Sequence, residues 1–427
     1  MEYKEIKNAR LSESYHVYKM DNGLTVMVYP MPAKNGIFAM LSARIGSVNR
    51  DFTLDGRRVE VPAGIAHFLE HKLFENENED AFSLFAKTGA NANAYTSFER
   101  TCYLFSATIN MEQSLQTLIR FVTNPVFSKE TVQKEQGIIA QEIKMYDDNA
   151  EWVLTNMMFK NMYKKHALND DIAGTVESIA MITPELLYDC YGAFYRPSNM
   201  VLAVAGNISH ETVKDICAQE YAGYKAQSGE VSEILADEPE GIVAKSSERA
   251  MSVFESMFGL SYKEKAFSGT SKLRDEMTLK LAVEMLTDET SDLFRKLYDC
   301  GLANDMFDAS VLSGRDYLCV AFSGESKQPA DAISEIMAEI ARVKEKGFDA
   351  ERFEECKRAF LGAELCSFDS MEAIAGKMTV SHFKDYDLYD IIDIIEDINL
   401  DDICDMLGRV LHEDNSAVAV IQPIDQP

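Results

Sequence analysis

Two periods of apolar and polar positions recur along this chain, one typical of buried strands and one of amphipathic helices. Continuous apolar runs bounded by polar turns predict strands at Gly23–Tyr29, Ile37–Ala43, Thr101–Ala107 and Val201–Gly206. A helical pattern follows Ser128, which is a plausible N-cap, and it predicts one long helix from Ser128 to Trp152. Its apolar positions are Val132, Ile138, Ile139, Ile143 and Met145. Helices and strands alternate irregularly, which favours an α+β fold.

Two shorter helices are expected ahead of that long one. The first has Pro62 near its start, where a missing N–H has little effect on the helix. The second is expected to run from an Asn78 cap to Gly89 as the residue that follows its end. A further helix is expected to begin at Ser209, directly after the buried strand.

The second half of the chain repeats features of the first. Phe127–Glu135 resembles Phe348–Cys356, and each of these segments follows a helix that is itself preceded by a strand. The corresponding strands are Thr101–Ala107 and Asp316–Gly324. The chain is therefore expected to hold two tandem copies of one unit. The predicted parts are a first domain at 1–223, a linker at 224–241 and a second domain at 242–427.

Composition limits the classes of function and partner. With 46% hydrophobic and 26% charged residues among 427, the chain reads as a globular protein of two or three domains. Its formal charge of −28 argues against a nucleic acid or an anionic membrane as partner. The N-terminal segment has no apolar run, and the eight cysteines show no C-x-x-C pair, so a cytoplasmic location with reduced thiols is expected.

The segment His67-Phe68-Leu69-Glu70-His71 carries the most specific chemistry. On a helix, His67 and His71 share one face and Glu70 lies close to it. Two imidazoles can then hold one Zn²⁺ ion while the carboxylate acts as a general base on a water. The alternative is an amphipathic helix with two hydrogen-bonded histidines.

A catalytic zinc site needs a third protein ligand, and the helix after Ser128 is the best source. Glu135 and Glu142 are seven residues apart, nearly two turns, and project from one stripe of that helix. One is expected to bind the ion and the other to support a ligand histidine, although spacing alone does not rank them. The second repeat has Ala363 at the position of Glu142 and no histidine pair, so the first half alone is expected to hold metal.

These segments resemble the pitrilysin and insulinase family of inverted zinc peptidases, and in particular its short bacterial members related to mitochondrial processing peptidase. The resemblance rests on Gly64–His71, Gly89–Ser97, Glu135–Glu142, Asp170–Thr175 and Tyr195–Met200. It implies one zinc per chain held by His67, His71 and Glu142, with Glu70 as the base and Glu135 supporting the site from behind. It also implies mostly antiparallel sheets that carry helices on one face.

The same resemblance implies how a substrate would bind. Gly89–Tyr95 is rich in glycine, alanine and asparagine, which allows another backbone to approach an extended strand, although a plain connecting loop is the alternative. In the family this stretch is the edge strand beside the zinc, so Asn93 and Ala94 would align the scissile peptide. The expected function is therefore that of a zinc metalloendopeptidase. The alternatives are a non-cleaving peptide-binding or assembly subunit and another zinc hydrolase such as an amidase.

One segment departs from the family pattern. Active members carry an arginine and a tyrosine in their second half or in a partner subunit, whereas Tyr298 and Asn304 stand at those places here. This departure predicts a heterodimer with a related subunit that supplies Arg and Tyr, with a homodimer as the alternative. His166, His210 and His382 stand alone in polar contexts and are expected to have surface or hydrogen-bonded roles.

Overall fold

The computed structural model describes residues 1–75, 80–224 and 229–424. They form two compact units, each assembled from three segments of the chain. The first unit consists of Met1–Ile143, Asp171–Ile234 and Cys366–Tyr389, and the second of Lys144–Asp170, Leu235–Leu365 and Asp390–Pro427. No helix within the described residues is long and apolar enough to cross a bilayer.

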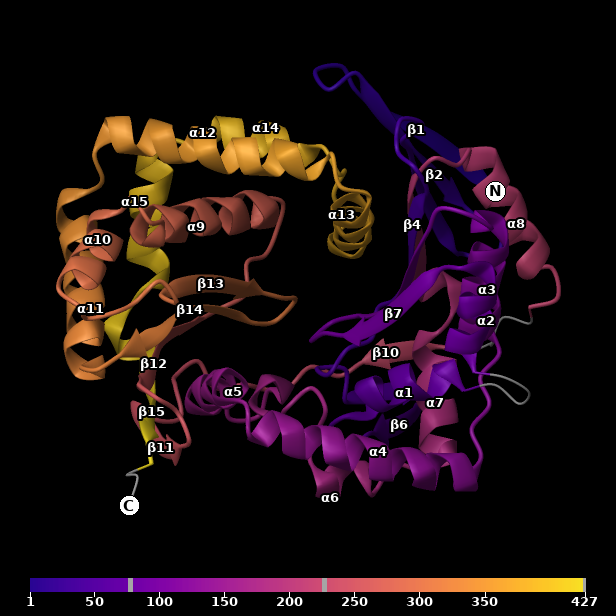
Figure 1. Cartoon of the computed structure of the whole chain (residues 1–427), viewed down its shortest axis with the longest axis horizontal. Coiled ribbons are helices and arrows are strands. Elements are labelled where there is room, and N and C mark those ends of the chain that lie inside the picture. The colour runs from indigo at the N-terminus through magenta and orange to yellow at the C-terminus, as the bar shows by residue number, and fades with distance from the viewer. Residues whose placement is uncertain (76–79, 225–228, 425–427) are drawn as a thin grey trace. The chain divides into compact units, whose positions relative to one another are not determined.

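The described part of the first unit is built on a seven-stranded sheet in the order β1-β2-β3-β9-β4-β8-β7 (Figure 1). The pair β3–β9 is parallel and its other neighbours are antiparallel. Its strands are β1 Glu2–Asn8, β2 Glu13–Lys19, β3 Thr25–Pro30, β4 Ile37–Ala43, β7 Asn91–Thr96, β8 Thr101–Ala107 and β9 Met200–Gly206. A smaller sheet pairs β5 Asp51–Leu54 with both β6 Arg57–Glu60 and β10 Val231–Glu233. The strands predicted at 37–43 and 101–107 are confirmed to the residue.

Helices cover both faces of the larger sheet, whereas the resemblance implied helices on one face. The second face is covered by α13, which the second repeat contributes. Ala39 and Leu41 of β4 belong to the buried core shared with α1 and α3, whereas Met40 lies on the opposite face and accepts a hydrogen bond from Thr379 of α13. Figure 1 shows α13 on the side of β4 away from α3 and α8. The helices are α1 Ile65–Phe74, α2 Ala81–Thr88, α3 Met111–Thr123, α4 Lys129–Asp147, α6 Val176–Ile179, α7 Pro184–Phe194, η2 Pro197–Asn199, α8 His210–Glu220 and α13 Met371–Lys384.

The second unit repeats five strands of the first, the run β3-β9-β4-β8-β7 that ends at the edge strand β7. Its sheet has the order β11-β15-β12-β14-β13, in which β11–β15 is the parallel pair, as β3–β9 is in the first unit. The strands are β11 Ser246–Met251, β12 Ser256–Glu264, β13 Asp308–Ser313, β14 Leu318–Ser326 and β15 Ser416–Pro423. Mostly antiparallel sheets with packed helices in two similar halves confirm the predicted α+β class and the predicted repeat.

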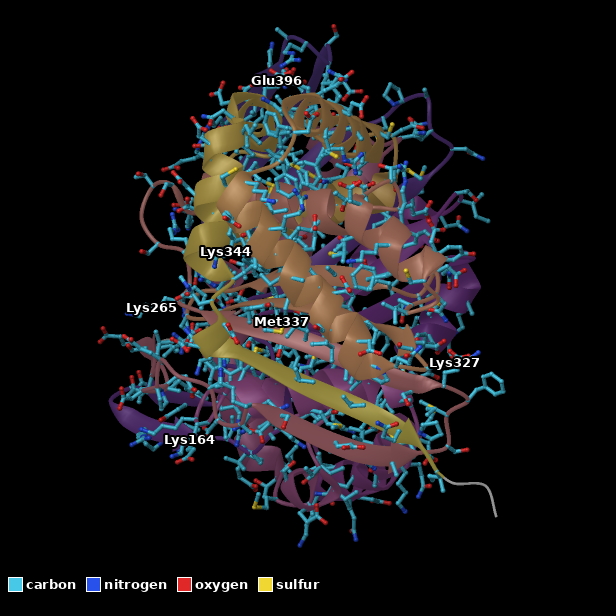
Figure 2. All side chains as sticks on the ribbon, turned by 90° about the vertical axis from the view of Figure 1, so that its left-hand side faces the viewer. Lys164, Lys265, Lys327, Met337, Lys344 and Glu396 are labelled. Carbon is cyan, nitrogen blue, oxygen red and sulfur yellow. The ribbon has the colours of Figure 1, made fainter. Side chains whose placement is uncertain are left out.

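Here too the sheet has a helix on each face. Gly259 of β12 faces α5, because a Cβ at that position would lie 2.4 Å from the Met158 sulfur. On the other face, Tyr262 of β12, three residues from Gly259, lines one cavity with Met337 and Lys344 of α11, and Figure 2 shows both of these residues along that helix. The helices are α5 Ala150–Met162, η1 Ala167–Asn169, α9 Lys272–Thr287, α10 Asp292–Asp299, α11 Pro329–Lys346, α12 Ala350–Ser367, α14 Asp390–Asp397, α15 Leu400–Val410 and η3 Glu413–Asn415.

The two repeats exchange one helix each. α5 comes from the first repeat and packs on β12 and β15 of the second unit, and α13 comes from the second repeat and packs on β4 and β9 of the first. Sequence periodicity does not reveal this exchange, because it shows that a helix needs an apolar partner without identifying the sheet. The boundaries 1–223, 224–241 and 242–427 stay a prediction about repeats along the chain. Within that linker, Val231–Glu233 forms β10.

The bounds and caps of three predicted helices differ from those in the structure or lie partly outside the described residues. The long helix predicted from Ser128 to Trp152 is wrong, since α4 ends at Asp147 and α5 begins at Ala150 with Asn149 as its N-cap. Pro62 precedes its helix, because α1 starts at Ile65. The Asn78 cap lies outside the described residues, and α2 is capped by the Asp80 side chain and ends at Gly89 as expected.

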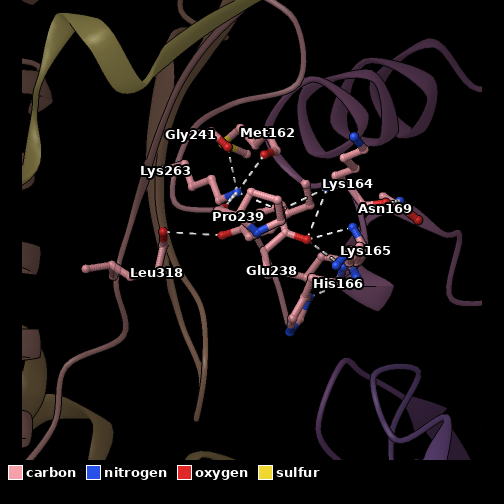
Figure 3. Close-up of polar contacts among 12 residues, drawn as sticks. Met162, Lys164, Lys165, His166, Asn169, Glu238, Pro239, Gly241, Lys263 and Leu318 are labelled. Carbon is pink, nitrogen blue, oxygen red and sulfur yellow. Dashed lines mark hydrogen bonds and ion pairs between the residues drawn. The ribbon is translucent and has the colours of Figure 1, made fainter. Parts of the chain in front are cut away.

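A partly buried ion pair joins the linker to the exchanged helix α5 (Figure 3). Lys263 of β12 donates to Glu238 at 2.7 Å and to the carbonyls of Met162, Pro239 and Gly241. The Glu238 carboxylate also accepts the backbone N–H groups of Lys164, Lys165 and His166, which follow α5. Burial would raise the pKa of Glu238, but these hydrogen bonds outweigh it and lower the pKa to about 2.

Glu238→Gln is therefore expected to destabilise the second unit by about 3 kcal/mol at pH 7. Ionised Glu238 stabilises the folded state fully above its unfolded pKa of about 4.5, and this contribution is lost as the pH falls toward 2. The difference from wild type should thus shrink across that window. Denaturant unfolding can be followed by fluorescence, because the single tryptophan, Trp152, lies on α5 of this unit. Exposed Glu240 offers a control, and an equal effect of Glu240→Gln would contradict the assignment.

Candidate metal centre

The histidine pair lies on α1, a helix buried on nearly all sides. Its apolar residues, among them Ile65, Phe68 and Leu69, belong to the core of the first unit. The helix begins at Gly64, whose φ of +90° favours glycine, and a Cβ there would lie 2.4 Å from the Ala173 carbonyl oxygen. This close backbone approach fixes the position of α1.

The two glutamates project from α4 toward α1. Val132, Ile139 and Ile143 bury one stripe of α4 in the same core, and Glu135 is itself only 5% exposed. Gln136 donates from its side chain to the carbonyls of the 179–182 segment, with 3.1 Å to Ile182. Tertiary contacts therefore hold α4 in place at the level of the glutamates.

His67, His71 and Glu142 converge on one point. Their ligand atoms all lie within 4.8 Å of one another. His67 Nε2 is 3.7 Å from Glu142 Oε1, and His71 Nε2 is 3.5 Å from Glu142 Oε2. A tetrahedral zinc about 2.0–2.2 Å from each ligand atom would place those atoms about 3.3–3.6 Å apart. The donor set and its spacing therefore fit one zinc ion.

Glu135 occupies the place expected of a supporting group. Its Oε1 lies 3.0 Å from His71 Nδ1, so His71 can donate from Nδ1 and present Nε2 to the centre. The structure thus separates the two glutamates that sequence spacing left equivalent, because Glu142 reaches the histidine Nε2 atoms and Glu135 reaches the far side of His71. The assignment of ligand and supporting roles to them stays a proposal.

The surroundings of the site favour a neutral His67 and raise the pKa of Glu70. Burial, together with the nearby His71, lowers the pKa of His67 to about 3, which leaves its imidazole free to coordinate. Burial lowers the pKa of His71, but the hydrogen bond to Glu135 and the nearby carboxylates raise it overall. Burial raises the pKa of Glu70 despite a hydrogen bond from Thr96, as suits a group that must take up a proton.

The small-residue segment forms β7, which lies at the edge of the first sheet. It pairs with β8 on one side, and among the described strands none pairs with its other side. Asn93 is exposed, and its side chain accepts a hydrogen bond from the Ala94 N–H at 2.9 Å. An open edge of this kind can accept an extended peptide. The role of Asn93 and Ala94 stays a proposal.

Sequence reasoning missed Thr96, the last residue of β7. Its hydroxyl donates to Glu70 Oε2 at 2.6 Å. The only sequence signal was its place two residues beyond Ala94, hence on the same strand face. A threonine at this position does not indicate a functional role until α1 is known to pack against β7.

The other candidate histidines lie apart from this centre. Across the described residues, His67, His71 and Glu142 are the only group found with metal-binding spacing. His166 is buried in the second unit, where it accepts from the Leu168 N–H and lies 3.3 Å from Asp316. His210 stacks on His16 in the first unit.

Comparison with known proteins gives consistent matches over the whole chain. The family described as "Insulinase (Peptidase family M16)" matches residues 56–176, and "Peptidase M16 inactive domain" matches residues 181–360. An "Uncharacterized zinc protease YmfH" of Bacillus subtilis is 38% identical over 426 residues, which cover 98% of this chain and 99% of that protein. A "Probable mitochondrial-processing peptidase subunit beta" of Schizosaccharomyces pombe is 32% identical over 218 residues, or 49% of this chain and 45% of that protein.

Solved structures show the same fold. A putative M16-like peptidase from Alicyclobacillus acidocaldarius superposes with a TM-score of 0.93 at 30% identity, over 99% of both chains. The periplasmic protease PqqL of Escherichia coli superposes with a TM-score of 0.74 at 18% identity, over 96% of this chain and 47% of that one. At that identity PqqL is informative about the fold alone.

Proposed function

Because the chain belongs to the insulinase family, peptidase family M16, we propose that it is a zinc-dependent endopeptidase whose ion is held by His67, His71 and Glu142. The convergence of these three side chains beside Glu70 is the observation that carries the proposal. The proposed substrates are peptides or small unfolded polypeptides, since an edge strand binds extended chains.

When bound, zinc would act as a Lewis acid on the scissile carbonyl and lower the pKa of the attacking water to about 7. Glu70 takes the proton of that water and passes it to the leaving amine. Glu135 holds His71 in the tautomer that presents Nε2 to the ion. Asn93 and Ala94 on β7 align the substrate backbone through main-chain hydrogen bonds.

The proposal is tested by digesting a mixture of peptides with the purified protein and reading the products by mass spectrometry. Internal cleavage should occur, should stop on addition of a chelator and should return with zinc. An absence of cleavage by the zinc-loaded protein, both alone and with the partner proposed below, would overturn it.

The second candidate is a peptide-binding or assembly subunit that does not cleave. The match of residues 181–360 to an inactive peptidase domain favours it for the second half of the chain. In the first half, the metal-binding side chains and Glu70 are all present, which argues against it. The same digest separates the two, since this candidate predicts peptide binding without products.

Glu135→Gln is expected to weaken zinc binding by about ten- to a hundredfold. The amide can still contact His71 but no longer supplies the carboxylate that polarises its imidazole. Competition with a chromogenic chelator would measure the dissociation constant. Unchanged zinc affinity would show that Glu135 does not support the ligand histidine.

We further propose that the active species is a heterodimer. Tyr298, which is exposed, stands where the family pattern places the cation. Asn304, which donates to Glu325 at 2.7 Å, stands where the pattern places the phenol. PqqL is about twice as long as this chain, and the yeast relative is named a subunit, which supports a second unit of related fold. Such a partner would supply Arg and Tyr to the transition state.

The isolated chain is therefore expected to cleave peptides about a hundredfold or more slowly than its complex with a related subunit, because donors to the developing oxyanion would be missing. Cleavage rates would be measured before and after co-expression with a family member that lacks the H-x-x-E-H motif. Full activity of the isolated monomer would contradict the prediction, and full activity of a homodimer would favour the alternative.

A cytoplasmic location also stays a prediction.

A further inference from the structure

A series of hydroxyl groups lies behind the Glu70 carboxylate in the first unit. Thr96 Oγ1 is 2.6 Å from Glu70 Oε2 and 3.4 Å from Thr101 Oγ1. Thr101 also contacts the hydroxyl of Tyr195, which is 2.7 Å from that of Tyr103. Thr101 and Tyr103 are fully buried, so these groups form a fixed polar layer. None of them takes part in the proposed metal binding.

The protons in this layer can be assigned by counting donors. A threonine hydroxyl has one proton to donate. Thr101 donates its proton to the Ile45 carbonyl at 2.9 Å and can only accept from other groups. Thr96 could donate to Thr101 or to Glu70, and the carboxylate is both nearer and charged. The Thr96 proton therefore points at Glu70 Oε2.

From this arrangement we infer that Thr96 is a positioning residue for the general base. The terminal torsion of a glutamate is broad, so an unheld carboxylate samples many orientations. With Oε2 held by Thr96, Oε1 is the oxygen that takes the proton of the attacking water. This inference rests on the proposed function, because it assigns Thr96 a part in that reaction.

The position of Thr96 ties base and substrate to one strand. Thr96 pairs with Thr101 across β7 and β8, and this register fixes where its hydroxyl lies. Ala94, proposed to align the substrate, is two residues away on the same face of β7. A peptide added to the edge of β7 would thus be placed in register with the oxygen that activates the water.

The test compares Thr96→Val, which keeps the shape but loses the hydroxyl, with Thr96→Ser, which keeps the hydroxyl. Thr96→Val should reduce kcat by about ten- to a hundredfold, with zinc content and KM nearly unchanged. Thr96→Ser should restore most of kcat. Thr88→Val is the matched control, because Thr88 also has a buried, hydrogen-bonded hydroxyl but lies on α2. Crystal structures of the zinc-loaded proteins supply a second readout, in which Glu70 should have several orientations in Thr96→Val and one in Thr96→Ser.

Each outcome decides the matter. A wild-type kcat and a single Glu70 orientation in Thr96→Val would overturn the inference. Equal losses in both Thr96 variants would also overturn it, since packing rather than the hydroxyl would then be responsible. If wild type cleaves no peptide while Glu70 loses its orientation only in Thr96→Val, the positioning role stands and the proposed peptidase function falls.

Discussion

Replacing Glu70 by glutamine is expected to reduce kcat for peptide cleavage by about 100- to 10,000-fold while zinc stays bound. The amide has nearly the shape of the carboxylate, so His67 and His71 keep their places on α1. It cannot take a proton from water, however, so the general-base step is lost. Thr96 would still hydrogen-bond to the amide oxygen.

Steady-state kinetics and elemental analysis on the same preparation would measure this effect. Glu130→Gln is the matched control, since Glu130 is an exposed glutamate in the first turn of α4. It should leave both kcat and zinc content unchanged. Peptide cleavage at the wild-type rate by Glu70→Gln would end the proposed mechanism.

His67→Ala and Glu142→Gln are each expected to leave less than about a tenth of the wild-type zinc and to abolish cleavage. Wild type should hold one zinc per chain. With one ligand removed, the remaining two side chains no longer close a three-ligand site, and dialysis should strip the ion.

Elemental analysis after dialysis measures the retained metal, and circular dichroism checks that the variants fold. His412→Ala serves as the control because His412 is an exposed histidine. Full zinc content in either ligand variant would show that the proposed ligand set is wrong. Loss of zinc in His412→Ala would point to nonspecific binding.

Local signals predicted much of the fold. The strand at Ile37–Ala43 was found to the residue because it is buried on both faces and is therefore apolar at every position except Ser42. The break between α4 and α5 was missed because the apolar period continues past it. Asn149 caps α5, but an asparagine in a helical pattern is equally often a solvated side chain.

The candidate site was predictable to the extent that its parts are local. His67, Glu70 and His71 lie within one turn of helix, so their spacing alone indicates a shared face. Glu142 lies 71 residues after His71, and spacing could not distinguish it from Glu135. Only the packing of α4 against α1 separates them. Thr96 was missed because its contact with Glu70 depends on the packing of α1 against β7.

The helix exchange implies that neither repeat is self-sufficient. A polypeptide severed within the linker would leave the 1–223 fragment without α13, so Met40 and its neighbours on β4 would face water. The other fragment would keep Lys263 but lose the Met162 carbonyl that α5 brings to it. Each fragment would need the other as an intermolecular complement. Such reciprocal dependence is what a helix-swapped homodimer of single repeats would leave behind once gene fusion joined its two copies into one chain.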